Sequence, residues 1–257
     1  MSCQSLCVLA LLLFTVIAGC GMRNATAPDL QRTSRRLLYL TQSAGFQHEV
    51  LPFSEQVMQD LAGRSQAFEV TVSHDASAIT GDSLRQYDAV MFYTTGELPM
   101  TDGQKTAFLD WIRSGKGFVG VHSATDTFYK WPEYGDMIGA YFDDHPWHQQ
   151  VVIRVEESNH PATRSLPKSF TLNEEIYQFR NWSRDRVHVL LSLDPSSVDL
   201  TNPKVKRTDK DFALAWWKAY GTGRVFYTAL GHERGVWQDE RFQQHLLGGI
   251  RWAMGDR

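Results

Sequence analysis

Residues suited to chemistry are concentrated between positions 117 and 148 of the 257-residue chain. A short apolar run at 118–121 leads into a polar turn that carries His122, Ser123 and Asp126. The segment closes with a second polar group, made of Asp143, Asp144, His145, Trp147 and His148. An imidazole binds divalent metals and also transfers protons near neutral pH, because its pKa is ordinarily about 6.5. We therefore expect a functional site here and regard the remaining chain as its scaffold.

The first half of the chain has the pattern of alternating strands and helices. Short apolar runs at 37–41, 68–72, 89–93 and 118–121 predict four strands. A helix is expected at 54–64, capped by Ser54, and a second helix begins at a capping box formed by Thr101 and Gln104. This alternation predicts a parallel sheet with helices on both faces, and ligands of such sheets gather at the carboxyl ends of the strands. The polar or flexible residues expected at those ends include His48, Thr94, Gly96 and His122.

The second half of the chain predicts a less regular set of strands. They are expected at 150–155, 171–179, 187–193, 213–217 and 223–230, ahead of a final helix at 240–254. Gly231 and His232 follow the last strand, which places another imidazole at a strand end. Alternation along 171–179 puts Glu175 and Tyr177 on one face of a strand. Glu174 falls on the opposite face, where we expect it to be solvated.

Two chemistries are open to the polar groups at the strand ends. In the first, imidazoles and a carboxylate bind a divalent metal such as zinc, with His48, His145 and His148 as the expected ligands. In the second, histidines and carboxylates act without a metal as general acids and bases. The expected catalytic residues are His122, Asp126, Glu175 and His232, and the expected substrate contacts are Thr94, Gly96, Ser123, Trp147 and Tyr177. Residue spacing does not choose between the two chemistries.

Composition narrows the range of partners and mechanisms. The net charge is -3, so the chain lacks the basic excess typical of nucleic-acid-binding proteins, and no nucleic-acid partner is expected. Its three cysteines are Cys3, Cys7 and Cys20. A chain processed at Cys20 would have no other thiol, which excludes disulfides, catalytic thiolates and cysteine-ligated metals.

The N-terminus has the features of a targeting segment. The apolar run 6–18 is too short to span a bilayer as a helix of about 20 residues. The sequence Ile-Ala-Gly-Cys at 17–20 resembles the lipobox of bacterial lipoproteins, although no Lys or Arg precedes Arg23. We expect a signal peptide at 1–19, a lipid on Cys20, a disordered tether at 20–35 and a single domain at 36–255. This organisation predicts a lipid-anchored protein of the cell envelope.

Five separated motifs resemble the ThuA-like family, which is named for a trehalose-utilisation protein. They are KGFVGVHSATDTFY, YGDMIGAYFDDHPWHQ, HPATRSLP, NEEIYQFRN and GRVFYTALGHERGVWQDERFQQHLLGGIRWAMG, and the resemblance covers residues 36–255. It implies a flavodoxin-like three-layer α/β fold related to class I glutamine amidotransferases, with a mostly parallel sheet and added antiparallel strands. It also implies a bacterial protein associated with sugar catabolism, without fixing the reaction.

The resemblance to class I glutamine amidotransferases implies that His122 occupies the position of their catalytic cysteine. Amidotransferases of this class carry a catalytic cysteine on a strained Gly-x-Cys-x-Gly elbow after a strand. Here the corresponding residues are Gly120, Val121, His122, Ser123 and Ala124. An imidazole therefore stands where the thiol would be, and thiol-dependent amidotransferase activity is not expected.

Three functions are compatible with the sequence. The favoured one is an enzyme of sugar catabolism that acts on a modified sugar, such as a keto-sugar or keto-glycoside, by lyase, isomerase or hydrolase chemistry. The alternatives are a non-catalytic carbohydrate-binding lipoprotein and a scaffold for partner proteins. The density of polar groups at the strand ends favours the first two over the third.

Overall fold

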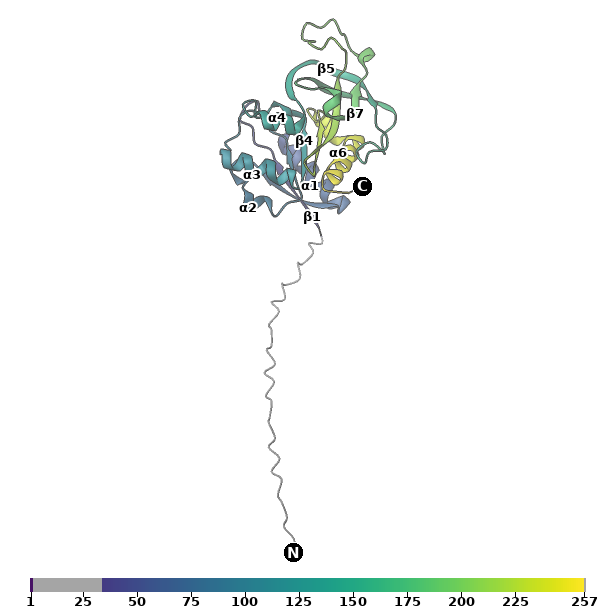
Figure 1. Ribbon diagram of the computed structural model, residues 1–257. Helices are drawn as coiled ribbons and strands as arrows, with labels where there is room; N and C mark the ends of the chain where they lie inside the picture. Colours follow the sequence, from purple (N-terminus) through teal and green to yellow (C-terminus); the bar gives the residue numbers. More distant parts are fainter. Residues whose placement is uncertain (2–33, 257) are drawn as a thin grey trace. The chain divides into compact units, whose positions relative to one another are not determined.

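The computed structural model describes Met1 and residues 34–256 (Figure 1). The predicted signal peptide, Cys20 and almost all of the predicted tether lie outside these residues. Among the described residues, no helix is both long enough and apolar enough to cross a membrane.

One nine-stranded sheet organises the described domain, in the order β2-β1-β3-β4-β9-β8-β7-β5-β6. Its strands are β1 (Arg35–Leu40), β2 (Phe68–Ser73), β3 (Ala89–Phe92), β4 (Gly117–Val121), β5 (Tyr141–Val155), β6 (Ser169–Arg180), β7 (His188–Leu193), β8 (Ala213–Tyr220) and β9 (Gly223–Thr228). Neighbours from β2 to β9 pair in parallel, and neighbours from β9 to β6 pair antiparallel. The parallel part has the flavodoxin-like strand order. The predicted fold, a parallel sheet with added antiparallel strands, is confirmed.

Six α-helices flank this sheet within the described residues. They are α1 (Leu51–Ser65), α2 (Gly81–Leu84), α3 (Asp102–Arg113), α4 (Pro132–Ile138), α5 (Arg234–Gln238) and α6 (Glu240–Ala253). Helix α5 packs against α1 and α6, whereas α2 packs against α3, so the sheet is covered from both sides (Figure 1). A parallel sheet covered in this way is apolar on both faces, and every residue of β3 and β4 is buried.

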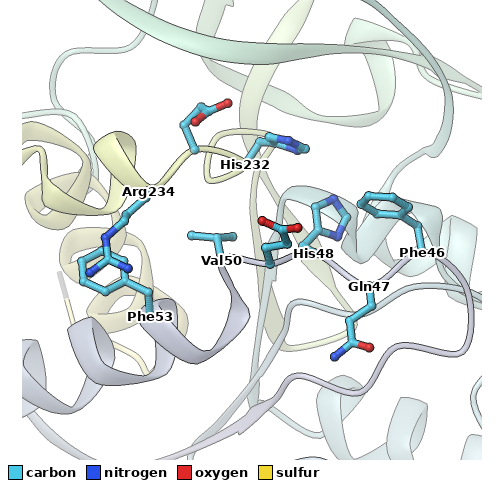
Figure 2. A pocket seen from close by; sticks show the side chains of 9 residues that line it. Phe46, Gln47, His48, Val50, Phe53, His232 and Arg234 are labelled. Atoms are coloured by element: carbon cyan, nitrogen blue, oxygen red, sulfur yellow. The ribbon is translucent and has the colours of Figure 1, made fainter.

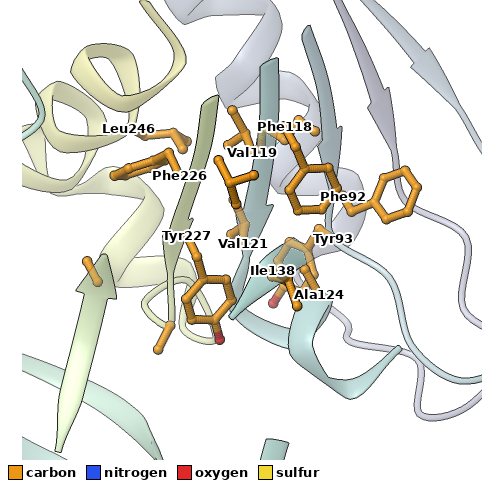
Figure 3. Close-up of a cluster of buried hydrophobic side chains, with 14 of the residues drawn as sticks. Phe92, Tyr93, Phe118, Val119, Val121, Ala124, Ile138, Phe226, Tyr227 and Leu246 are labelled. Atoms are coloured by element: carbon orange, nitrogen blue, oxygen red, sulfur yellow. The ribbon is translucent and has the colours of Figure 1, made fainter. Parts of the chain in front are cut away.

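A hydrophobic core layer lies on each face of the sheet, and two adjacent residues of β9 contribute one side chain to each layer. Figure 3 shows Phe226 beside Leu246 of α6, and Tyr227 on the side of Ile138 of α4. All four side chains are at most 1% exposed. Successive side chains of a strand point to opposite faces, so one dipeptide contributes an aromatic ring to each layer.

The helix starts were only partly predicted. The capping box of Thr101 and Gln104 is present at the start of α3. The predicted Ser54 cap is wrong, because α1 begins at Leu51 with Pro52 in its first turn. Proline favours that position, where its missing N–H costs no hydrogen bond. The buried Ser54 hydroxyl instead lies 2.6 Å from Tyr39 Oη.

The length of β5 is the largest departure from the sequence prediction. Residues 143–148 were expected in a polar segment outside any strand, but β5 includes them and begins at Tyr141. Its pairing with β6 shifts register twice, between Phe142 and Trp147. Such irregularities bend a strand and redirect its side chains. The long β5–β6 hairpin thereby brings His145 and Glu175 within 3.3 Å of each other beside the end of β4.

His245 of α6 is buried in the core and has a structural role. Its buried ring donates a hydrogen bond from Nδ1 to Ala162 O at 2.9 Å. Burial lowers the pKa of His245 to about 4, from an ordinary value of 6.5. The folded state is therefore more stable when the His245 ring is neutral.

This requirement predicts acid sensitivity of the fold. The contribution of His245 to stability is complete above its unfolded pKa of 6.5 and is lost as the pH falls toward its folded pKa of about 4. The full loss is about 3 kcal/mol, at about 1.4 kcal/mol per pKa unit. In urea denaturation, the stability advantage of the wild type over His245→Gln should shrink between neutral pH and about pH 4.5. An advantage that stays constant with pH would contradict this account.

Candidate metal centre

His122 is the first residue after β4 and occupies the predicted elbow. Its φ is +45°, in the left-handed region that side chains with a β-carbon disfavour, and its ring is fully buried. Such strain persists only where the surroundings fix the conformation. Tyr227 Oη donates to the His122 carbonyl oxygen at 2.7 Å, and Nδ1–H of the ring donates to Ala229 O at 2.7 Å. The strained elbow predicted from the sequence is therefore present, with an imidazole on it.

Three potential ligand atoms from separate parts of the chain meet beside this ring. His122 Nε2 lies 3.2 Å from His232 Nδ1 and 3.4 Å from Glu175 Oε2. His232 Nδ1 and Glu175 Oε2 lie 3.2 Å apart. His232 belongs to the loop after β9, and Glu175 belongs to β6. The three atoms form a nearly equilateral triangle.

Hydrogen bonds alone do not satisfy all three atoms of this triangle. Because Nδ1 of neutral His122 donates to Ala229, its Nε2 presents a lone pair. Glu175 Oε2 is also an acceptor, so a proton on His232 Nδ1 would have to serve two acceptors. A divalent cation would bind all three lone pairs. The ligand atoms of a tetrahedral zinc site lie roughly 3.3–3.6 Å apart, since Zn–N and Zn–O bonds are about 2.0–2.2 Å. The observed spacing fits such an ion.

His48 adds a fourth possible ligand from the loop between β1 and α1. Its ring is 5% exposed, and its centroid lies 5.0 Å from that of His122 and 5.3 Å from that of His232. One ligand atom from each of His48, His122, Glu175 and His232 lies within 4.8 Å of all the others. His48 Nδ1 is buried and has no hydrogen-bond partner in the described part of the chain. We call these four residues the His3Glu cluster, a donor set that suits zinc and related divalent transition metals.

The protonation states of the cluster favour a cation. Burial lowers the pKa of His122, and it lowers that of His48 to about 3, so both rings are neutral at pH 7. Burial alone would raise the pKa of Glu175, but its contacts with His122 and His232 outweigh burial and lower the pKa well below its usual value. Burial would lower the pKa of His232, but Glu175 reverses this and raises it. The raised pKa of His232 means that protons compete with a metal for this ring, so metal binding would weaken as the pH falls.

Glu174 was predicted to be solvated, and this prediction is wrong. It is fully buried, and its carboxylate accepts hydrogen bonds from the backbone N–H groups of Gly231 at 2.7 Å, His232 at 3.2 Å and Glu175 at 2.8 Å. Alternation failed because α5 and the loop before it pack against β6, so this part of the strand has no solvent face. Burial raises the pKa of Glu174 to about 8, although the N–H donors oppose the shift. Through these hydrogen bonds, Glu174 holds the backbone of His232 in place.

The other two predicted metal ligands lie next to the cluster rather than in it. His145 Nδ1 is 3.3 Å from Glu175 Oε1, the carboxylate oxygen outside the triangle. His148 Nε2 is 2.5 Å from Glu233 Oε1, and both side chains are partly exposed. His148 and Glu233 also form a possible ligand group with His232. The structure thus brings His145 and His148 to the rim of the site, where each contacts a carboxylate.

Two cavities open on the cluster and share Phe46, His48 and His232. The larger has a volume of about 510 Å³ and is otherwise lined by residues 47–50, Phe53 and residues 233–234 (Figure 2). The smaller has a volume of about 300 Å³. Both volumes are within the range of small-molecule sites, about 300–1,000 Å³.

Asp126 and Tyr177 line the smaller cavity with Glu175 and His145. Asp126 accepts a hydrogen bond from Tyr129 Oη at 2.5 Å, and burial raises the pKa of Asp126. The Tyr177 ring lies 4.3 Å from that of His122, between centroids. The predicted shared face of Glu175 and Tyr177 is therefore confirmed, and Asp126 lies where a proton carrier could face a ligand.

Four of the predicted substrate contacts lie away from both cavities. Thr94 Oγ1 is buried and bonds Thr127 Oγ1 at 2.8 Å, and the fully buried Ser123 Oγ has no partner among the described residues. Trp147 is 3% exposed and donates from Nε1 to Asp199 O at 2.9 Å. Gly96 has a φ of +74° and lies against the backbone of the 42–48 loop. The structure does not bring these residues to the cluster, and Gly96 instead supports the loop that carries His48.

Sequence reasoning missed Phe46, Glu233 and Arg234, which all line the larger cavity. Figure 2 labels Phe46 and Arg234 among its lining residues. A lone aromatic in a loop has no periodic pattern to reveal it. Glu233 and Arg234 follow His232 directly, so the strand-end rule that selected His232 could have included them.

The fold and its histidine elbow define the class of protein. The domain has a glutamine amidotransferase-like α/β fold, as solved structures with similar folds also indicate. Residues 36–253 match the family model ThuA, described as trehalose utilisation, and the chain therefore belongs to the ThuA family. The resemblance seen in the sequence motifs is confirmed.

Solved structures support this assignment. The chain is similar to a ThuA-like protein from Bacteroides uniformis, with 26% identity and a TM-score of 0.72 over 91% of this chain and 95% of that one. It is also similar to a ThuA-like protein from Parabacteroides merdae, with 20% identity and a TM-score of 0.67 over 86% and 90% of the two chains. A cytoplasmic protein from Salmonella typhimurium shares the fold at 10% identity, with a TM-score of 0.57 over 85% and 98%. A search of proteins with curated descriptions returned no match.

Proposed function

We propose that this protein is a metal-dependent enzyme of sugar catabolism, with a divalent cation such as zinc bound by His48, His122, Glu175 and His232. The observation that carries the proposal is the triangle of His122 Nε2, Glu175 Oε2 and His232 Nδ1, with edges of 3.2–3.4 Å. The buried and unpartnered Nδ1 of His48 adds to it. The family description, trehalose utilisation, supports a sugar as the substrate.

The chemistry of the site favours a substrate that carries a carbonyl group. A bound divalent ion would act as a Lewis acid toward a carbonyl or hydroxyl oxygen. A C–H bond next to a polarised carbonyl is more acidic, so a keto-sugar is a better substrate for proton transfer than an unmodified one. Asp126 lines the same cavity as Glu175 and is suited to exchange that proton, because burial raises its pKa toward neutrality. Lyase and isomerase reactions of a keto-sugar use such a step, and hydrolysis of a keto-glycoside can use it when elimination is followed by addition of water.

The residues around the cluster would position the groups that react. His145 contacts the outer oxygen of Glu175, and Glu174 fixes the backbone of His232. Partners of this kind orient metal ligands and tune their basicity. Thiol chemistry has no place in the proposal, since the sequence from Gly21 onward contains no cysteine.

Metal analysis of the protein purified without a histidine tag tests the proposal. We expect about one equivalent of a divalent transition metal per chain, removable by a chelator and restored by zinc, because the cluster provides one set of four ligands. Protein that retains no divalent ion after zinc supplementation and desalting would falsify the proposal. Saturable sugar binding by a metal-loaded protein that forms no product would instead favour the carbohydrate-binding alternative.

A further inference from the structure

Phe46 is the most unusual side chain at the mouth of the site. It is 65% exposed, and among residues 34–256 no other large hydrophobic side chain is exposed. Its ring is almost perpendicular to the His48 ring, with centroids 4.9 Å apart and an interplanar angle of 84°. Figure 2 shows Phe46 beside His48 at the border of the larger cavity. Every comparable side chain among residues 34–256 is at least partly buried, and the exposed Phe46 ring lines a cavity of the size that binds small molecules.

The loop that carries Phe46 has a fixed backbone. Thr95 Oγ1 donates to Phe46 O at 2.7 Å and accepts from Gly45 N–H at 3.2 Å. Ala44 N–H donates to Thr95 O at 2.8 Å, and Ser43 forms a parallel bridge with Thr95. These contacts anchor the exposed ring beside the cluster, which lowers the entropy cost of binding a ligand against it.

Phe46 lines both cavities, together with His48 and His232. The two cavities therefore adjoin, and the residues that they share include two of the cluster. The larger cavity adds the polar side chains of Gln47, Glu49 and Arg234. The smaller adds those of Asp126, His145 and Tyr177. Each cavity thus combines hydrogen-bonding groups with the same aromatic side chain.

We propose that Phe46 is a stacking platform for a substrate of two rings, a glycoside that occupies both cavities with its linking bond beside the His3Glu cluster. A sugar ring has an apolar C–H face and hydroxyl groups around its edge, which matches an aromatic face bordered by polar side chains. This inference rests on the proposed function, since it assigns the substrate class of the same site.

Calorimetric titration of the zinc-loaded full chain tests the inference. The probes are trehalose, maltose and cellobiose, each as the native sugar and as a mono-keto derivative, and each is compared with the methyl glucoside of matching anomeric form and oxidation state. Mass spectrometry of each sample records any product. We expect at least one two-ring probe to bind about tenfold or more tightly than its methyl glucoside, because it contacts both cavities.

Variants of Phe46 separate the stacking role from a structural one. Phe46→Ala should weaken binding of that two-ring probe by about tenfold, the usual effect of losing one aromatic stacking contact, whereas Phe46→Trp should keep most of the affinity. Both variants should keep their bound zinc and the thermal midpoint of the wild type, because an exposed side chain adds little to stability.

Three outcomes would overturn the inference. The first is equal affinity for methyl glucosides and two-ring probes, the second is Phe46→Ala with wild-type affinity, and the third is no binding of any probe to zinc-loaded protein. In the first two cases the proposed function survives if zinc is bound at one equivalent. The proposed function itself fails if zinc is not bound, and the metal measurement on the same samples shows which of the two is wrong.

Discussion

Replacing Glu175 by glutamine should abolish stoichiometric binding of a divalent metal. The carboxylate is the single anion of the His3Glu cluster, and its Oε2 contacts both His122 and His232. An amide of the same shape has no negative charge, and it could direct N–H groups at lone pairs that the ion would otherwise bind. Loss of the ion removes several kcal/mol of transition-state stabilisation, which corresponds to a loss in turnover of about a thousandfold or more.

Metal content and turnover of Glu175→Gln are measured on the same preparation. The matched control is Glu69→Gln, which makes the same chemical change at an exposed carboxylate of β2 that is 3.9 Å from Arg36. This control should keep both its metal and its activity. A Glu175→Gln protein that binds one equivalent of zinc as tightly as the wild type would exclude Glu175 as a ligand.

Replacing Gly96 by alanine should damage both the stability of the domain and its metal site. The residue has a φ of +74°, and a β-carbon there would lie 2.7 Å from backbone atoms of both Ala44 and Gly45. The backbone strain alone costs about 1–3 kcal/mol, and the contact forces the 42–48 loop to move. Since that loop carries His48, we expect urea denaturation to show a loss of at least about 2 kcal/mol and zinc titration to show weaker binding.

Gly63→Ala is the control for this substitution. Gly63 lies in α1, and a β-carbon added there meets no atom within 4 Å. Alanine favours helices over glycine by about 1 kcal/mol, so this variant should be as stable as the wild type or slightly more stable, with unchanged zinc affinity. If Gly96→Ala behaves in the same way as Gly63→Ala, Gly96 has no part in positioning the loop.

The sequence was sufficient to find the parts of the site that follow general rules of α/β folds. His122 and His232 follow buried strands directly, and ligands of parallel sheets gather at those ends. Glu175 was predicted from alternation within a strand, and it does share its face with Tyr177. These positions could be predicted because strand ends and strand faces are local properties of the sequence, whereas the catalytic roles assigned to His122, Glu175 and His232 stay predictions.

The remaining features depend on tertiary packing. The start of β5 could not be predicted, because its residues 143–148 are mostly polar and lack the apolar alternation typical of a strand. Glu174 is buried because α5 and the 229–233 loop cover the second face of β6, which no local pattern reports. Phe46 is recognisable only from its exposure, which depends on how distant segments pack.

The sheet order would give a metal bound by the His3Glu cluster a role in the integrity of the domain. His122 follows β4 in the parallel half, whereas Glu175 lies on β6 at the antiparallel edge, and four other strands separate them in the sheet. An ion bound by both would crosslink the two halves across the curled sheet, as a disulfide does in other small domains. Any ligand that binds the folded state alone shifts the folding equilibrium toward it. Metal supply would then govern how much intact protein a cell maintains, independently of any effect on the reaction.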